Sequence, residues 1–398
     1  MTNRSVLISG ASVAGPALAF WLHRYGFEPT IVERAPAVRP GGYAVDFRGA
    51  SMRVLERMGL LEAIREKQTR IGAITIVDRN NRRVASMPDG FTSGELEILR
   101  GDLAALFHDR TRETTEYLFG DSIAAVEEDA DGVKVRFERG GQRKFDLVVG
   151  ADGLHSKLRS IAFGDEARFV RYLGYHVAIF TIPNYLNLDH AGLYYGTLGK
   201  KVGIFSGGDP EEAKASFFFA SEPLDYARRD SAQQKRILRS QFEGEGWELP
   251  RLLNLMDATP DFYFDSVSQV KMDHWSNGRS VLLGDAAWCA SPLSGMGSGM
   301  AVVGAYVLAG ELAEANGDYR VAFKQYEIRM RDFVHKCQGI ADGGTEWFVP
   351  RTRFRLWLSS QMWKILPYTP WKNMMIEVPL KIGNSIDLRS YQPSAMAN

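Results

Sequence analysis

Residues 5–33, SVLISGASVAGPALAFWLHRYGFEPTIVE, constrain the fold of this chain more than any other stretch. They read in order as an apolar strand, a glycine-bearing turn, a helix, a second strand and an acidic residue, which is the pattern of a βαβ unit that binds a dinucleotide. The turn from Gly10 to Gly15 follows the G-x-G-x-x-G spacing except at its middle glycine, where Ser12 stands. The sequence therefore predicts a nucleotide site with one altered position.

The N-terminus of the helix gives this turn its chemistry, because unpaired N–H groups and the positive end of the helix dipole attract a pyrophosphate. We expect Gly10 to permit the sharp turn and Gly15 to permit close packing of the helix on the strand. Glu33 follows Gly15 at the spacing of an acid that binds ribose hydroxyls. A turn that uses small residues only for packing is the alternative reading. The residues of this unit that we assign to cofactor binding are Gly10, Ser12, Val13, Ala14, Gly15, Glu33 and Arg34.

Two later stretches repeat the arrangement of a buried strand that enters a glycine-bearing turn. FDLVVGADGLHSKLR, residues 145–159, carries Asp152 at the tip of its turn. GRSVLLGDAAWCASPLSGMGSGMA, residues 278–301, carries Gly284 and Asp285, followed by a Pro/Gly-rich loop and a helix of small residues. An NAD-dependent dehydrogenase needs only the first unit, whereas three such units can converge on one extended cofactor.

Taken together, these motifs resemble those of the class A FAD-dependent aromatic monooxygenases, the para-hydroxybenzoate hydroxylase-like family, from residue 5 to about residue 340. The resemblance implies FAD as the bound cofactor, with Asp285 at the ribityl chain, Asp152 near the pyrophosphate and Arg100 at the flavin. A surface salt bridge is the alternative for Arg100. The resemblance also places the helix that follows residues 292–299 with its N-terminus at the N1–C2=O edge of the flavin. The cofactor residues implied in this way are Gly42, Arg100, Asp152, Gly284, Asp285, Pro292, Gly295, Met296 and Gly297.

A closer resemblance links the chain, nearly from end to end, to the soil-type tetracycline destructases, which are FAD monooxygenases that inactivate tetracyclines by inserting oxygen. The stretches that carry it are GGYAVDFRG (41–49), EILRGDL (97–103), FTIPNYLNLDH (180–190), DFYFDSVSQVKMDHW (261–275), SPLSGMG (291–297), GAYVLAGEL (304–312) and NSIDL (384–388). Ser12, Trp288 and Met296 depart from the pattern of this subgroup. The resemblance therefore leaves other aromatic or polyketide substrates open beside tetracyclines.

The resemblance further implies a reaction in which NADPH, or NADH, docks transiently and reduces FAD. The reduced flavin then captures O₂ as a C4a-hydroperoxide, from which one oxygen atom passes to the substrate. Gly41 and Gly42 offer backbone freedom for a movement of the flavin. No catalytic base is assigned and no metal site is expected. The residues that we name for the substrate pocket are Arg48, His176, Phe180, Pro292 and Met296, with His190 and His274 as further candidates and a structural hydrogen bond as the alternative for each histidine.

The predicted fold class is α/β: a Rossmann-like FAD-binding domain of the GR2 type, with an inserted, mostly β substrate domain and a C-terminal helix. We expect the FAD-binding domain to comprise residues 1–72, 97–170 and 277–340, with a β-meander at 122–149. The substrate domain comprises residues 73–96 and 171–276, and residues 341–398 form a C-terminal helical segment. Residues 351–365 read as an amphipathic helix packed on the body. The alternatives are a lid over the substrate entrance and a helix on a membrane surface, suggested by Trp357, Trp363 and Trp371.

Composition narrows the range of partners. Lys and Arg balance Asp and Glu at 48 each, so the bulk charge gives no support for a nucleic-acid partner. Two cysteines, Cys289 and Cys337, cannot make a disulfide framework, and no apolar run reaches the ~20 residues of a membrane span. We expect a cytoplasmic monomer whose partners are a small aromatic or polyketide substrate and O₂. A flavin-dependent halogenase, which lacks support because no WxWxIP stretch is present, and a non-catalytic flavin- or ligand-binding protein are the alternative functions.

Overall fold

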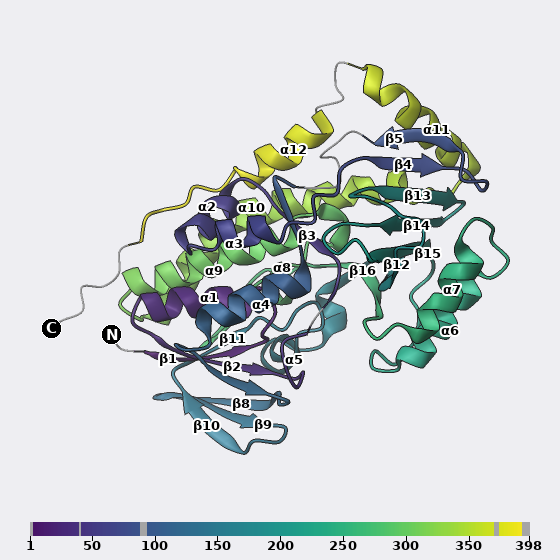
Figure 1. The fold of residues 1–398 in the computed structure, drawn as a ribbon. Helices are drawn as coiled ribbons and strands as arrows, with labels where there is room; N and C mark the ends of the chain where they lie inside the picture. Colours follow the sequence, from purple (N-terminus) through teal and green to yellow (C-terminus); the bar gives the residue numbers. More distant parts are fainter. Residues whose placement is uncertain (1–2, 40, 88–93, 370–373, 392–398) are drawn as a thin grey trace.

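The computed structural model describes residues 3–39, 41–87, 94–369 and 374–391, and its elements are arranged around two large sheets (Figure 1). The first sheet has six strands in the order β17-β18-β11-β1-β2-β7, and all neighbours are parallel except the edge pair β17–β18. Its strands are β1 (Ser5–Ser9), β2 (Glu28–Glu33), β7 (Glu116–Phe119), β11 (Leu147–Gly150), β17 (Ser276–Asn277) and β18 (Ser280–Leu282). The predicted α/β class, with the first βαβ unit at its centre, is therefore confirmed.

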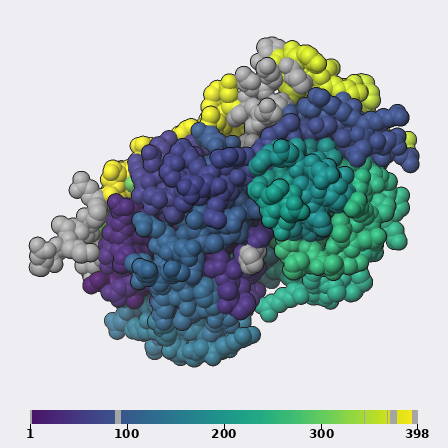
Figure 2. Space-filling view, in the orientation of Figure 1, coloured from purple at the N-terminus to yellow at the C-terminus, as the bar shows by residue number. Residues whose placement is uncertain are grey.

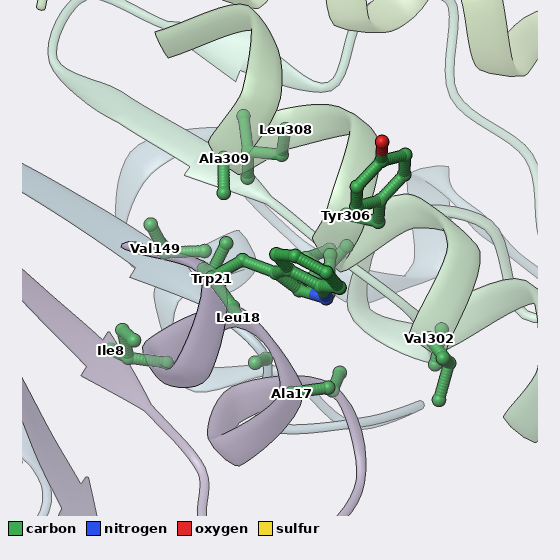
Figure 3. Close-up of a cluster of buried hydrophobic side chains, with 14 of the residues drawn as sticks. Ile8, Ala17, Leu18, Trp21, Val149, Val302, Tyr306, Leu308 and Ala309 are labelled. Carbon is green, nitrogen blue, oxygen red and sulfur yellow. The ribbon is translucent and has the colours of Figure 1, made fainter. Parts of the chain in front are cut away.

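Two helices cover the centre of this sheet and begin close together. Helix α1 (Ala14–Arg24) follows β1 directly, and helix α9 (Gly297–Glu314) packs against it. In Figure 3, Trp21 of α1 lies against Tyr306 of α9, and their ring centroids are 4.8 Å apart in an edge-to-face arrangement. Helix α9 is buried on nearly all sides, which explains why its sequence is apolar without a polar face. This packing fixes both helix N-termini at the carboxyl ends of the parallel strands.

Smaller elements connect the layers. The β-meander predicted for residues 122–149 is confirmed in β8 (Ile123–Asp129), β9 (Gly132–Phe137) and β10 (Gln142–Phe145), whereas residues 147–150 join the six-stranded sheet. A two-stranded ribbon of β3 (Ala44–Phe47) and β6 (Leu96–Leu99) leads directly into α4 (Arg100–Thr111). The remaining short helices of the body are α2 (Ala50–Arg57), α3 (Leu61–Glu66), α5 (Lys157–Ala162), α8 (Asp285–Trp288), η1 (Glu166–Arg168) and η2 (Pro292–Ser294).

The second sheet has seven strands in the order β16-β12-β15-β14-β13-β4-β5, and only the pair β13–β4 is parallel. Its strands are β4 (Ile74–Val77), β5 (Arg83–Met87), β12 (Val170–Pro183), β13 (Gly192–Thr197), β14 (Lys200–Phe205), β15 (Glu212–Ala220) and β16 (Tyr263–Val270). One face, called the outer face here, packs on α6 (Ser231–Phe242) and α7 (Leu249–Ala258) (Figure 1). The opposite, inner face carries Tyr194, Phe218 and Val177. The domain boundaries given above stay a prediction.

The C-terminal part is helical. Helix α10 (Tyr319–Phe348) packs on α9, α11 (Arg353–Ile365) packs on β5, and η3 (Leu366–Tyr368) and α12 (Met374–Gly383) follow. Figure 2 shows the yellow C-terminal segments along one edge of the molecule, next to the blue strands β4 and β5. Helix α11 buries Trp363 and exposes Trp357, as an amphipathic helix does, and Trp371 lies outside the described residues. None of the helices among the described residues is both long enough and apolar enough to cross a bilayer.

Candidate cofactor and active site

The three glycine-bearing turns, which are far apart in the sequence, meet at one cavity of about 570 Å³. Its walls come from the turn after β1, the loop after β11 and the N-terminal end of α9, together with the start of α4 and the segment before β16. The predicted cofactor residues that line it are Gly10, Ser12, Val13, Ala14, Glu33, Arg34, Gly42, Arg100, Asp152, Asp285 and Gly297. The predicted residues that do not line it are Gly15, Gly284, Pro292, Gly295 and Met296.

Close backbone contacts explain the glycines of these turns. A Cβ at Gly10, whose φ is +110°, would lie 2.5 Å from the carbonyl oxygen of Ala151. A Cβ at Gly15 would lie 1.9 Å from the carbonyl oxygen of Gly10. Gly284, with a φ of +67°, sits where a Cβ would meet the Cβ of Ala14 at 3.2 Å. Gly15 and Gly284 therefore shape the site through packing rather than by facing the cavity.

Two of the helices that begin at the cavity, α1 and α9, have N-termini without a side-chain cap. Neither α1 nor α9 has a capping hydrogen bond or an acidic residue in its first turn. Their unpaired N–H groups and dipoles favour a negatively charged group. Ser12 adds a hydroxyl to the cavity wall, for which no hydrogen-bond partner occurs among the described residues. This set of donors fits the pyrophosphate of an extended dinucleotide such as FAD.

The three predicted acidic residues, Glu33, Asp152 and Asp285, differ in the hydrogen-bond partners of their carboxylates. Glu33 accepts hydrogen bonds from the backbone N–H groups of Ala11 and Ala35, each at 2.9 Å. Asp152 accepts from the backbone N–H of Lys157 at 2.8 Å, so its carboxylate holds the turn before α5. Burial raises the pKa of Asp285, and the Arg100 guanidinium opposes that rise. A hydrogen bond from the Cys289 thiol also opposes the rise. Glu33 and Asp152 are engaged by backbone N–H groups, which leaves Asp285 as the predicted acid whose carboxylate is open to a cofactor hydroxyl.

An aromatic end closes the cavity towards the seven-stranded sheet. Gly42 has a φ of +104°, and a Cβ there would lie 3.5 Å from the Cβ of Arg100. The Arg100 guanidinium lies 5.9 Å from the ring centroid of Tyr43, and the rings of Tyr43 and Tyr263 are 5.6 Å apart. Burial raises the pKa of both tyrosines, which keeps them neutral. Flat, apolar groups of this kind suit an aromatic ring system.

The ribbon of β3 and β6 places a buried pair of carboxyl groups beside the loop at residues 291–297. Asp46 and Glu97 are direct cross-strand partners, and Arg48 lies 3.5 Å from the Asp46 carboxylate and 3.5 Å from the carbonyl oxygen of Gly295. Glu97 also accepts a hydrogen bond from the hydroxyl of Thr69. Burial and the nearby charge of Asp46 raise the pKa of Glu97 to about 8. At neutral pH this carboxyl therefore keeps its proton and can donate it.

Sequence reasoning named Arg48 and Gly295 but missed the acidic pair. The available signal was the position of Asp46 and Glu97 inside two short apolar strands, where a charged residue is uncommon. Gly295 adopts a left-handed conformation, and a Cβ there would lie 3.3 Å from Nη1 of Arg48. Pro292 is exposed at the start of η2, and Met296 is buried in the core beside α9. Gly295 therefore lies beside Arg48 and the pair of Asp46 and Glu97, whereas Pro292 and Met296 do not line the cavity.

Two of the predicted pocket residues lie on the outer face of the seven-stranded sheet. His176 lies between the rings of Phe219 and Phe264, at centroid distances of 5.5 and 5.6 Å, and its Nδ1 is 2.9 Å from Ser221 Oγ. Burial lowers the pKa of His176 to about 4, so it is neutral. Phe180 stacks on a phenylalanine of β15 in the same core. We keep neither residue in the proposed pocket, because alternate residues of β12 face opposite sides of the sheet.

The other histidine candidates have structural contacts. His190 Nδ1 lies 2.8 Å from the carbonyl oxygen of Thr69, and His274 is 81% exposed beside Glu327. Sequence reasoning missed His155, which follows the Asp152 turn. Its Nδ1 lies 3.0 Å from Glu166 and its Nε2 3.0 Å from Asp265 on β16.

The charges around His155 join the two sheets. Burial alone would lower the pKa of His155, but the hydrogen bonds with Asp265 and Glu166 raise it to about 9. The protonated ring therefore links the loop after β11 to the second sheet at neutral pH. No group of three or more His, Cys, Asp or Glu side chains in the described part of the chain is arranged to hold a metal ion.

Comparisons with known proteins agree with this geometry. The family model described as an FAD binding domain matches residues 3–169 and 263–337. A flavin-dependent monooxygenase of Legionella longbeachae is 39% identical over 98% of this chain and 99% of that protein. An uncharacterized protein of Mycobacterium tuberculosis is 46% identical over 84% of this chain and 92% of that protein. The crystal structure of tetracycline destructase Tet(51) superposes with a TM-score of 0.87 at 35% identity, covering 98% of this chain and 100% of that chain.

Proposed function

The chain belongs to the class A FAD-binding monooxygenase family, and from this premise we propose that it inserts one oxygen atom from O₂ into an aromatic or polyketide substrate. Tetracyclines are the substrate class that we propose to test first. The structural likeness to a tetracycline destructase supports that choice, together with the length of the match. The observation that carries the proposal is the single cavity at which three glycine-bearing turns and two uncapped helix N-termini meet.

We propose that FAD occupies this cavity. Bound FAD would supply the redox chemistry that activates O₂. The N-termini of α1 and α9 would hold its negatively charged groups, and Asp285 would accept from its ribityl hydroxyls. Arg100, which lines the cavity beside Tyr43, would stabilise negative charge that develops on the ring system. We further propose NADPH, or NADH, as a transiently docked reductant, because the sequence has no second G-x-G-x-x-G turn.

The substrate would lie between the loop at residues 291–297 and the inner face of the seven-stranded sheet. Leu293 of that loop packs beside Phe218 and Tyr263 of the inner face, so water is largely excluded there. Arg48 would fix the loop through the carbonyl oxygen of Gly295, and the protonated Glu97 would donate its hydrogen bond to Asp46 and hold the pair beside that loop. These residues bind, orient and exclude water, and none of them needs to act as a nucleophile.

A turnover assay tests the proposal. Purified flavin-loaded protein, NADPH and tetracycline are mixed in air, and NADPH absorbance is followed together with the mass of the product. We expect a gain of one oxygen atom that requires both protein and NADPH. Asp285→Ala, which removes a carboxyl from the cavity wall, should lower flavin content and turnover together. Flavin-loaded protein that yields no oxygenated product from tetracycline, phenols or other polyketides would contradict the proposed function.

A further inference from the structure

Helix α11 carries a stripe of exposed apolar side chains. Phe354, Trp357 and Ile365 are 67%, 58% and 57% exposed, and Tyr368, directly beyond the helix, is 89% exposed. Their spacing of three, eight and three residues places them on one side of a helix with about 3.6 residues per turn. The rings of Phe354 and Trp357 are neighbours, with centroids 6.3 Å apart. We call these four residues the outward stripe.

The opposite side of α11 fixes the helix on the body of the protein. Trp363 and Leu366 are buried in a cluster with Met87 of β5 and Tyr194 of β13. Helix α11 therefore lies at the edge of the molecule, beside the edge strand β5 (Figure 1). Among the described residues, none of α11 lines the cofactor cavity. The outward stripe thus belongs to a preformed surface that is separate from that cavity.

The charged residues of this segment are all positive. Residues 347–376 contain five Lys or Arg and no Asp or Glu, although the whole chain has 48 residues of each sign. The exposed side chains of Arg353 and Lys364 have no ion-pair partner among the described residues, whereas Arg355 pairs with Glu346. Two cations on the same helix as the outward stripe are therefore free to meet an anionic partner.

This combination of groups fits the surface of an anionic bilayer. Single exposed apolar residues are normal on a protein, whereas a continuous stripe beside charged residues marks an interaction site. Aromatic side chains enter the boundary between headgroups and acyl chains, and basic side chains on the same helix meet the lipid phosphates.

A second copy of the chain fits this face less well. A symmetric dimer formed through α11 would bring Arg353 and Lys364 close to the same charges of the partner, with no acidic residue in the segment to offset them. The stripe also offers roughly 500 Å², since each of its side chains has about 150–250 Å² when fully exposed, and each partner in a standard interface contributes about 800 Å².

We propose that the outward stripe docks α11 reversibly on a bilayer that contains anionic lipid. Phe354, Trp357, Ile365 and Tyr368 enter the interfacial region, and Arg353 and Lys364 contact the headgroups. Trp363, which the sequence also suggested for such a surface, belongs to the core instead. The inference does not depend on the proposed function, because it uses neither the cavity nor the cofactor.

Co-sedimentation of the flavin-loaded protein with lipid vesicles tests the inference. One set of vesicles is phosphatidylcholine alone, and the other contains phosphatidylcholine and phosphatidylglycerol in equal amounts. We expect binding to the mixed vesicles at about 0.05 M salt and much less at about 0.5 M salt, because salt screens the charges. Phe354→Ser combined with Trp357→Ser should weaken this binding about 10-fold or more. Val321→Ser combined with Ile328→Ser removes two apolar side chains of similar exposure from α10 and should bind as the wild type does.

A second variant tests the charges separately. Arg353→Gln combined with Lys364→Gln should weaken binding to the mixed vesicles at low salt, about 5-fold for each lost charge. Arg229→Gln combined with Arg236→Gln, at exposed positions before and within α6, is the matched control. All variants should keep their flavin and melting temperature, since the substituted side chains are exposed. If the stripe variant melts below the wild type, the charge variant alone decides the question.

Several outcomes would overturn the inference. They are a wild type that does not sediment with the mixed vesicles at low salt, one that sediments equally with phosphatidylcholine alone, and stripe or charge variants that bind as tightly as the wild type. Size-exclusion chromatography adds one more: if the wild type is a dimer and the stripe variant a monomer, this face joins two copies instead. Turnover is measured separately, so failure of the proposed function and failure of this inference are distinguishable.

Discussion

The two ends of the proposed active site are built in different ways. At the nucleotide end, backbone N–H groups of α1 and α9 meet the cavity, and glycines such as Gly10 fix their positions. At the substrate end, buried side chains of paired strands contribute, among them Asp46 on β3 and Glu97 on β6. The nucleotide end therefore depends on backbone geometry, which few substitutions at its glycines can preserve. The second end can change its ligand by substitution while the strands stay paired.

The largest expected effect lies at the nucleotide end, in Gly10→Val. A valine there would place its Cβ 2.5 Å from the carbonyl oxygen of Ala151 at a φ of +110°, adding strain of about 1–3 kcal/mol to a direct overlap with the backbone. We expect the purified variant to be colourless, as judged by flavin absorbance. Gly246→Val is the control, because a Cβ at Gly246 meets nothing within 4 Å. A yellow Gly10→Val protein with full flavin would disprove the role of backbone geometry at this end.

The difference between backbone geometry and side-chain placement also explains which parts of the site the sequence could predict. Glycine turns at the ends of buried strands leave a local signature, so the three turns around Gly10, Asp152 and Asp285 were recognisable and do meet at one cavity. The face of a sheet on which a side chain lies depends on strand register, and register is determined by pairing between strands that are far apart in the sequence. His176 and Phe180 were therefore placed in the pocket, although the register of β12 turns them to the outer face. The α/β class was predictable for the same reason as the turns.

At the substrate end, Glu97→Gln should change the pH dependence of stability. Glu97 ionises near pH 4.5 in the unfolded chain, whereas burial and the charge of Asp46 raise its pKa to about 8 in the folded protein. The folded state therefore binds more protons between these values, and the free energy of unfolding falls as pH rises from about 4.5 to about 8. Glutamine cannot ionise, so the variant should gain roughly 4 kcal/mol over the wild type at pH 8 and little at pH 5.

Urea unfolding from pH 5 to pH 9 measures this effect. Glu113→Gln, at an exposed position after α4, is the control and should run parallel to the wild type. If Glu97→Gln also runs parallel, the carboxyl pair does not hold a proton in the folded state. The contrast between the two ends would then lose its clearest electrostatic feature.

At the junction between the two sheets, His155→Gln should change the pH dependence of stability less than Glu97→Gln does. The hydrogen bonds with Asp265 and Glu166 outweigh burial and raise the pKa of His155 from 6.5 to about 9. The stabilisation by the protonated ring is therefore complete below about pH 6.5 and is lost as pH rises through about 9. It amounts to about 3 kcal/mol at most. We expect the melting temperature of the wild type to fall across this range more steeply than that of His155→Gln.

His335→Gln, on an exposed position of α10, serves as the control for the loss of one histidine. An equal slope in His155→Gln and the wild type would show that the junction between the sheets does not depend on this charge. The two pH experiments are distinguishable, because the effect of Glu97 develops between about pH 4.5 and pH 8 and that of His155 between about pH 6.5 and pH 9.

The smallest expected effect is that of Ser12→Gly, which restores the usual middle glycine of the turn. Ser12 lines the cavity beside the N-terminus of α1, and its hydroxyl can donate one hydrogen bond to a phosphate oxygen. Losing one such bond should weaken FAD binding about 2- to 10-fold, and the protein should stay yellow. Titration of the flavin-free protein with FAD measures the change, and Ser12→Val, which cannot donate and is bulkier, should bind more weakly than either. If Ser12→Gly instead binds FAD more tightly than the wild type, the hydroxyl obstructs the phosphate, and even this end of the site is tuned by a side chain as well as by its backbone.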